Sequence, residues 1–197
     1  MIAYLLASLP TPRLAEPPAM EPATFVERCR GFVSDERWRD LDELLAARSK
    51  GQGAASTAMP ARVPRDGSRP DRPRDPVART WHDLSAQIDD AVAIQRGAHT
   101  RRDPTPYLQR PSGYRVDLVE AVERAFGAQN PGARERALDE VRWRLADELA
   151  LGEPDGFAAL YARAVQLRLA WRWAQWEAAA GWTALETSLR TLEAPHA

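Results

Sequence analysis

The sequence predicts a mainly α-helical protein, a multi-helix bundle with a long C-terminal helix. Apolar residues recur every three or four positions over most of the 197 residues. Helix-starting residues precede these runs, and glycines follow several of them. No alternation of strands and helices indicates a parallel sheet. We therefore expect residues 1–48 to form an extended segment and a helical hairpin, residues 49–79 a flexible linker or insertion, and residues 80–197 a helical domain whose core is shared with 1–48.

The N-terminal part predicts two helices after an ambiguous start. Ile2, Tyr4 and Leu6 alternate, which fits a short strand, but the run from Met1 to Pro10 fits a buried helical turn equally well. Pro22 suits the first turn of a helix, and Ser34 suits the N-cap of a second helix. The expected inner faces contain Phe25, Val26, Cys29, Phe32 and Val33, then Trp38, Leu41, Leu44 and Leu45.

The middle of the chain changes composition abruptly. Residues 49–79 are rich in proline and arginine and contain almost no large apolar side chain. Such a segment cannot bury enough apolar surface to offset the entropy of ordering it. We therefore expect a disordered insertion.

Four further helices are expected after this segment. Thr80 with Asp83 resembles a capping box, and Asn130 with Pro131 fits an N-cap followed by the first helical position. The expected N-caps are Thr80, Ser112, Asn130 and Asp155, and the expected helix ends are Gly97, Gly127 and Gly152.

The C-terminal helix is expected to be long and apolar on two opposite faces. One stripe continues past Gly181 to Leu192, which favours a single helix. The second stripe contains Val165, Leu169, Trp173 and Trp176. A helix with two apolar faces must be covered on both. Either this chain supplies both layers, or a partner protein binds the second stripe, so these four residues are candidate interface contacts.

No catalytic, cofactor-binding or metal-binding constellation is visible in the sequence. His82, His99 and His196 are scattered, without a second ligand at helical spacing, and no phosphate-binding glycine loop is present. Asp139 and Arg142 are three residues apart, which predicts a structural ion pair. We therefore expect a protein that is not an enzyme itself and needs no cofactor.

Charge and apolar runs bear on the compartment. Basic and acidic residues nearly cancel, 27 against 28, so no global field would attract nucleic acid or an anionic membrane. The lone Cys29 fits a reducing compartment, and no run approaches the roughly 20 apolar residues of a membrane helix. A cytoplasmic location is expected.

Several motifs resemble an uncharacterised bacterial family, a domain of unknown function encoded in operons for V/A-type (vacuolar-type) rotary ATPases. The resemblance covers both ends of the chain but not its proline-rich middle. The residues that carry it are Tyr4 through Pro10, Phe25, Cys29, Asn130, Pro131, Glu135, Leu138, Asp139, Arg142, Trp143, Asp147, Glu148, Phe157, Tyr161, Ala162, Leu167, Arg172, Trp173 and Gly181. The resemblance implies association with ATPase subunits, with the membrane reached only indirectly through that complex.

Three functional hypotheses follow. The first is a non-catalytic accessory, assembly or central-stalk-like subunit of a bacterial V/A-type ATPase, peripheral to the inner membrane through the complex. The alternative is a nucleic-acid-binding regulator that uses the arginine-rich segment 62–79, although its aspartates and lack of aromatic residues count against stacking. The third is a hydrolase with carboxylates from different helices that meet in a pocket.

Overall fold

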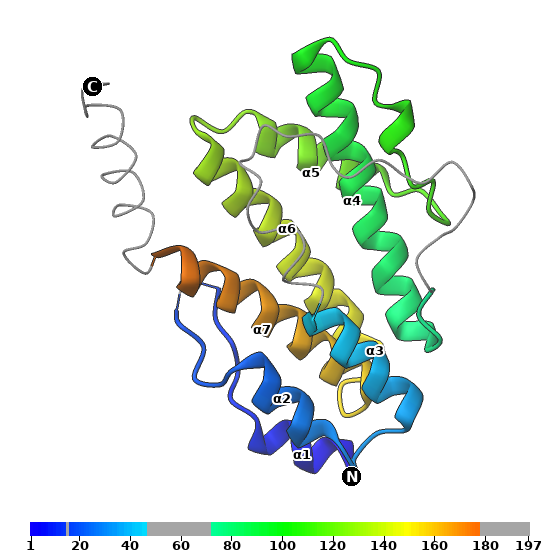
Figure 1. Cartoon of the computed structure of the whole chain (residues 1–197), viewed down its shortest axis with the longest axis vertical. Coiled ribbons are helices and arrows are strands. Elements are labelled where there is room, and N and C mark those ends of the chain that lie inside the picture. Colours follow the sequence, from blue (N-terminus) through cyan, green and yellow to red (C-terminus); the bar gives the residue numbers. More distant parts are fainter. Residues whose placement is uncertain (15, 47–71, 178–197) are drawn as a thin grey trace, which may run out of the picture.

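The computed structural model describes residues 1–14, 16–46 and 72–177, and every regular element in these ranges is a helix. Their order along the chain is visible in Figure 1. The elements are α1 (Ile2–Ser8), α2 (Pro22–Cys29), α3 (Asp35–Ala46), α4 (Pro76–Thr100), the 3-10 helix η2 (Thr105–Tyr107), α5 (Val116–Phe126), α6 (Pro131–Leu151) and α7 (Phe157–Glu177). The mainly α-helical fold class is confirmed.

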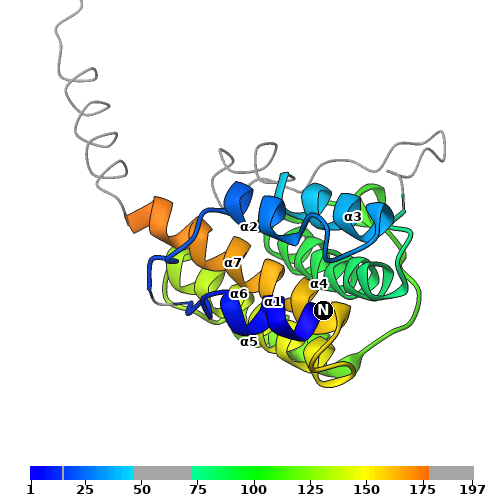
Figure 2. The ribbon, with the colours of Figure 1, turned by 90° about the horizontal axis from the view of Figure 1, so that it is seen from below.

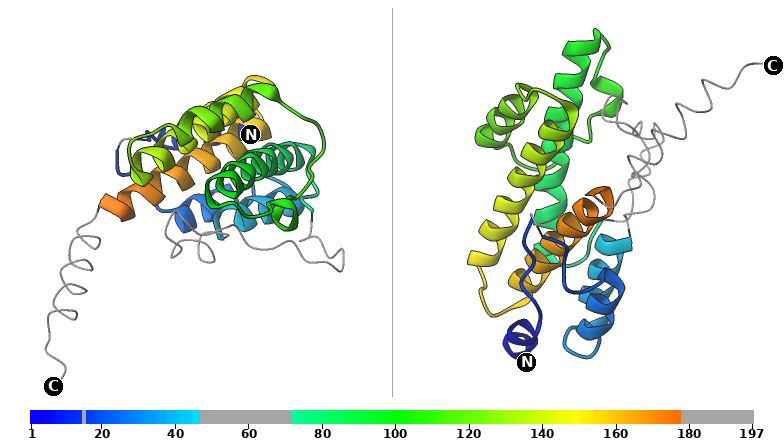
Figure 3. Two further views of the ribbon diagram at one scale, coloured as in Figure 1. Left: turned by 90° about the horizontal axis from the view of Figure 1, so that it is seen from above. Right: turned by 90° about the vertical axis from the view of Figure 1, so that its left-hand side faces the viewer.

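Helix α7 lies at the centre of the fold and packs against α1, α2, α3, α4 and α6. Helices α2 and α3 lie on one side of α7, and α5 lies on the opposite side, against α4 and α6 (Figures 2 and 3). One hydrophobic core joins these helices, because buried residues of all seven α-helices belong to the same cluster. Its fully buried large side chains include Phe25, Leu41, Ile88, Val122, Leu138, Leu145, Phe157 and Leu160.

The first element is a helix, so the strand interpretation of the N-terminus is wrong. Leu5, Leu6 and Leu9 are buried, whereas Tyr4 is 76% exposed. This spacing follows the helical period, and it places one side of α1 against α7.

Helix α4 begins five residues earlier than the sequence predicts. Asp75 is its N-cap and accepts the backbone N–H of Val77 at 2.8 Å, and Pro76 occupies the first turn. The Thr80 hydroxyl instead donates to the Pro76 carbonyl within the helix. The expected linker therefore ends before residue 76, and residues 47–71 lie outside the described part.

The end of α4 also differs from the prediction. The helix continues past Gly97 to Thr100, and Arg101 takes a left-handed conformation with φ of 54°. Gly97 is needed for a different reason, because a Cβ there would lie 2.8 Å from the Arg102 carbonyl oxygen. The chain folds back over Gly97, whose carbonyl accepts the Arg102 N–H.

Of the other four predicted caps, two are confirmed and two are wrong, in addition to Thr80. Asn130 caps α6 by accepting the Ala133 N–H at 2.8 Å, and the Ser34 hydroxyl accepts the Arg37 N–H at 3.5 Å. Ser112 does not cap α5, which begins at Val116 after Arg115. Asp155 does not cap α7 either, because the Glu153 carboxylate accepts the Ala158 N–H. Gly127 and Gly152 do follow the last residues of α5 and α6.

None of the described helices is long and apolar enough to cross a membrane. The continuation of the C-terminal stripe beyond residue 177, including Gly181, lies outside the described residues.

Candidate functional site

Three arginines of α7 form hydrogen bonds with separate segments of the chain. Arg163 donates to the carbonyl oxygens of Leu9, at 3.1 Å, and Pro10, at 3.4 Å. Arg168 donates to the Leu44 carbonyl at 3.2 Å, near the end of α3. Arg172 bonds the Asp139 carboxylate of α6. The polar positions of α7 therefore bind other parts of the same molecule.

Asp139 is the centre of a buried ionic cluster. Its side chain is 0% exposed, and its Oδ1 accepts from Arg142 Nη1 at 3.0 Å. Its Oδ2 accepts from Arg172 Nη2 and from the Trp173 indole Nε1, the latter at 2.8 Å. A buried carboxylate is stable only when its charge and its lone pairs are satisfied in this way. We call Asp139, Arg142, Arg172 and Trp173 the Asp139 cluster.

The ionic contacts extend outward from this cluster to α4. Arg142 also contacts Asp89 at 3.4 Å, and Glu135 lies between Arg172, at 3.9 Å, and Arg96, at 3.6 Å. Burial alone would lower the pKa of Arg142, but the Asp139, Asp89 and Glu135 carboxylates outweigh burial and raise it. Arg142 therefore stays charged, and the contacts link α4, α6 and α7.

This arrangement indicates a structural role for the Asp139 cluster. Both Asp139 oxygens already accept hydrogen bonds, and the carboxylate has no exposed surface. A general base needs reach to a substrate proton, which Asp139 lacks. The predicted Asp139–Arg142 pair is confirmed, whereas Arg172 and Trp173 join it from a helix that sequence spacing could not place.

A second buried carboxylate, that of Asp40, binds the backbone of the residues that lead into α4. Asp40 of α3 accepts the backbone N–H groups of Arg74, at 3.4 Å, and Asp75, at 3.0 Å. Asp75 in turn accepts from Arg37 Nε at 2.8 Å. Burial, with a smaller contribution from Asp40, raises the pKa of the neighbouring Tyr161. Arg74 and Asp75 are therefore fixed to α3, just before α4 begins.

The four candidate interface residues of α7 do not form an open face. Val165 is 2% exposed and Leu169 is 6% exposed, and both belong to the protein's own core. Trp173 is half-buried and bonds Asp139. The side chain of Trp176 lies outside the described residues. The interface interpretation is therefore wrong for Val165 and Leu169, because α2 and α3 cover the side of α7 that α6 leaves open.

The remaining motif residues are distributed between surface and core. Tyr4 and Pro10 are exposed, although the Pro10 carbonyl accepts from Arg163. Asp147 accepts from Gln166 Nε2 of α7 at 2.6 Å, and Tyr161 is 3% exposed. These contacts hold α6 and the N-terminal segment to α7.

The nucleophilic and metal-ligating side chains of the described part do not converge. Cys29 is fully buried, and burial raises the pKa of its thiol to about 12. No group of three or more His, Cys, Asp or Glu residues within the described ranges could hold a metal ion.

A small cleft of about 100 Å³ between α5 and α6 brings Asp117 and Glu148 together. Both carboxylates bond Arg115, Asp117 at 2.6 Å and Glu148 at 2.8 Å. The favourable bonds to these carboxylates raise the pKa of Arg115. The cleft therefore does not present the free pair of carboxylates that the hydrolase hypothesis requires.

An apolar surface patch lies where α5 begins and α6 ends. Tyr114 is 74% exposed, Val116 is 58% exposed and Leu151 is 77% exposed. The Arg115–Glu148 ion pair brings these segments together, and Leu151 follows Glu148 by three residues on the same helix face. We call Tyr114, Val116 and Leu151 the end patch. The sequence analysis did not predict the end patch. The signal that could have indicated it is that Val116 and Leu151 are not among the buried apolar residues of α5 and α6.

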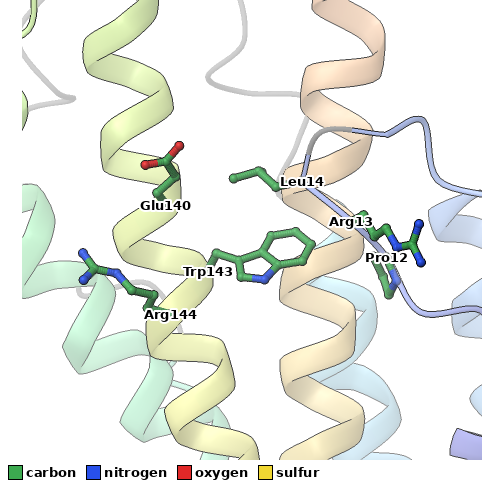
Figure 4. Close-up of a pocket in the computed structure, with 6 residues that line it drawn as sticks. All are labelled: Pro12, Arg13, Leu14, Glu140, Trp143 and Arg144. Atoms are coloured by element: carbon green, nitrogen blue, oxygen red, sulfur yellow. The ribbon is translucent and has the colours of Figure 1, made fainter.

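A second apolar surface lies between α6 and the segment that follows α1. A groove of about 540 Å³ is lined by Pro12, Arg13, Leu14, Glu140, Trp143 and Arg144. The Trp143 indole extends from α6 across the groove, and Leu14 lies opposite (Figure 4). Trp143 and Leu14 are only partly buried and pack against the core. We call this surface the Trp143 groove.

We found no match to this chain among protein-family models, curated proteins or solved structures. The resemblance to the family of ATPase operons therefore stays a prediction.

Proposed function

We propose that this protein is a protein-binding helical subunit, and that the end patch contacts its partner. The observation that carries the proposal is the exposure of Tyr114, Val116 and Leu151 at the start of α5 and the end of α6, two segments that the Arg115–Glu148 ion pair joins. Large apolar side chains gathered on a surface are typical of protein interfaces, and tyrosine is enriched in them. The buried charges, in contrast, are used to hold helices together.

At a finer level, we propose an accessory, assembly or central-stalk-like subunit of a bacterial V/A-type ATPase, without catalytic activity of its own. The support for this partner is the sequence resemblance. The motif residues Asp139, Arg142, Arg172 and Trp173 lie in one cluster, which fits a scaffold that must stay rigid while it is loaded. Its location would be cytoplasmic, at the membrane only through the complex.

The nucleic-acid alternative gains no support from the described end of its segment. Arg72 bonds Asp83 at 2.7 Å, and Arg74 lies 3.6 Å from Glu36. These arginines are paired with the protein's own carboxylates, which would compete with phosphate groups. Residues 62–71 lie outside the described part.

The test is purification from the host at native expression through an N-terminal affinity tag. We expect V/A-type ATPase subunits to co-purify with the wild type. The double variant Tyr114→Ser with Leu151→Ser should reduce their recovery at least tenfold, because it removes the apolar anchors without touching the core. Ile94→Ser is the matched control, since Ile94 is 49% exposed outside the end patch.

The outcomes separate the two levels of the proposal. If the tagged protein is recovered without any ATPase subunit, the proposed role as an ATPase subunit is overturned. Recovery of the same proteins by the wild type and by the double variant overturns the assignment of the end patch.

A further inference from the structure

Carboxylates border the end patch. Its border contains every charged residue within about four positions, or one helical turn, of Tyr114, Val116 or Leu151. The acidic members, all of them exposed, are Asp117, Glu120, Asp147, Glu148, Glu153 and Asp155. We call these carboxylates the acidic rim. The basic members of the border are Arg110 and Arg115.

The two arginines do not neutralise the acidic rim. Arg115 is shared between Asp117, at 2.6 Å, and Glu148, at 2.8 Å, so one positive charge lies between two negative charges. Arg110 pairs with none of the described carboxylates, and Asp155 forms no ion pair within the described part of the chain. The surface around the end patch therefore carries a surplus of negative charge.

Helix dipoles account for only part of this surplus. Asp117 lies in the first turn of α5, and Glu153 caps α7, so both complement positive helix N-termini. Asp147 and Glu148 instead lie near the C-terminal end of α6, whose last turn contains no basic residue. A helix C-terminus is stabilised by cations and disfavours carboxylates. The end of α6, where Leu151 is exposed, is therefore a place where additional positive charge is favourable.

We propose that the end patch binds a basic amphipathic segment of another protein. Apolar side chains of that segment cover Tyr114, Val116 and Leu151, and its lysine or arginine side chains contact the acidic rim. Protein interfaces commonly combine an apolar centre with a polar border, and complementary charges select the partner and speed association. The inference rests on the proposed function, because it takes the end patch as the interface.

The test is photo-crosslinking in the host, with the full-length protein at native expression and p-benzoylphenylalanine in place of Tyr114. This replacement keeps an aromatic side chain in the end patch. We expect a crosslink to another protein, located by peptide mass spectrometry. Over the roughly 15 residues around the attachment point, about four turns of a helix, basic residues should outnumber acidic residues.

Charge reversal in the acidic rim is the second measurement. Asp155→Arg with Glu120→Arg, introduced into the crosslinking chain, should lower the crosslink yield at least fivefold, because like charges then face the basic segment. Both side chains are exposed, so the substitutions leave the core intact. The neutral pair Asp155→Asn with Glu120→Gln should lower the yield by a smaller factor.

The matched control reverses two exposed acids on the α2–α3 side of the protein, Asp42→Arg with Glu27→Arg. Asp42, like Asp155, forms no ion pair within the described ranges. Glu27, like Glu120, belongs to an exposed ion pair with a near neighbour. The control changes the net charge equally and should leave the crosslink yield unchanged.

The other outcomes separate this inference from the proposed function. A crosslink to a segment of another protein without a basic excess, or a yield that reversal of the acidic rim leaves unchanged, overturns the inference and keeps the end patch as an interface. A crosslink only to a second copy of this chain also overturns the inference. The absence of any crosslink to a protein removes the end patch from the proposed function, and the inference is overturned with it.

Discussion

Asp139 shows how one side chain can link two helices. Its carboxylate, which has no exposed surface, accepts from Arg142 on its own helix and from Arg172 and Trp173 on α7. Desolvating a carboxylate and two guanidinium groups costs several kcal/mol, and the mutual attraction offsets this cost only while all partners remain. The loss of a single partner is therefore more harmful than the loss of the whole cluster.

Asp139→Ala should lower the free energy of unfolding by about 3–5 kcal/mol, because the largely buried guanidinium groups of Arg142 and Arg172 would lose the carboxylate that they share. Urea denaturation followed by circular dichroism measures this loss. The control is Glu140→Ala on the same helix, where a 59% exposed side chain lies 3.7 Å from Arg136. Exposed pairs contribute about 0–1 kcal/mol, so equal losses in the two variants would contradict the central role of Asp139.

At the scale of elements, α4 shows where a helix start depends on tertiary contacts. Its N-cap Asp75 is fixed by the Asp40 carboxylate, which accepts the Asp75 N–H, and by Arg37. Both partners lie on α3, about 35 residues away in sequence. The contacts select Asp75 over Thr80, whose sequence context resembles a cap more closely.

Asp75→Ala should destabilise the protein by about 1–2 kcal/mol through the lost cap, with an additional contribution from the Arg37 ion pair. Thr80→Ala should change the free energy of unfolding by less than about 0.5 kcal/mol, since the Thr80 hydroxyl is exposed and bonds only within its helix. Thermal and urea unfolding of the two variants measure the difference. A larger loss for Thr80→Ala would contradict the observed helix start.

The sequence could predict elements that depend on near neighbours. Asn130 caps α6 through the N–H of Ala133, only three residues away, and Pro131 occupies the first turn. Asp139 and Arg142 are likewise three residues apart and pair on one helix. It could not predict that Arg172 and Trp173 meet Asp139, because that contact needs the rotation and position of α7 against α6. The same limit explains the burial of Val165 and Leu169, whose cover comes from helices far away in the chain.

At the scale of the whole molecule, α7 connects the two parts of the described chain. Helices α1, α2 and α3 pack on it from residues 1–46, and α4 and α6 pack on it from the later part. Arg163 and Arg168 add hydrogen bonds to the carbonyl groups of Leu9 and Leu44. One core shared in this way should unfold as one unit.

Leu41→Ala tests this cooperativity, because Leu41 of α3 is 0% exposed and far in sequence from α5. The substitution should cost about 2–5 kcal/mol, as expected for truncation of a fully buried leucine. If the core is cooperative, the slowest-exchanging amides of α5 and α6 should lose hydrogen-exchange protection by the same free energy, although neither helix contains the substituted residue. Ala46→Gly at the exposed end of α3 is the control, and should leave these amides nearly unchanged. Loss of protection confined to α1–α3 would show that residues 1–46 unfold separately, and that α7 carries two independent halves.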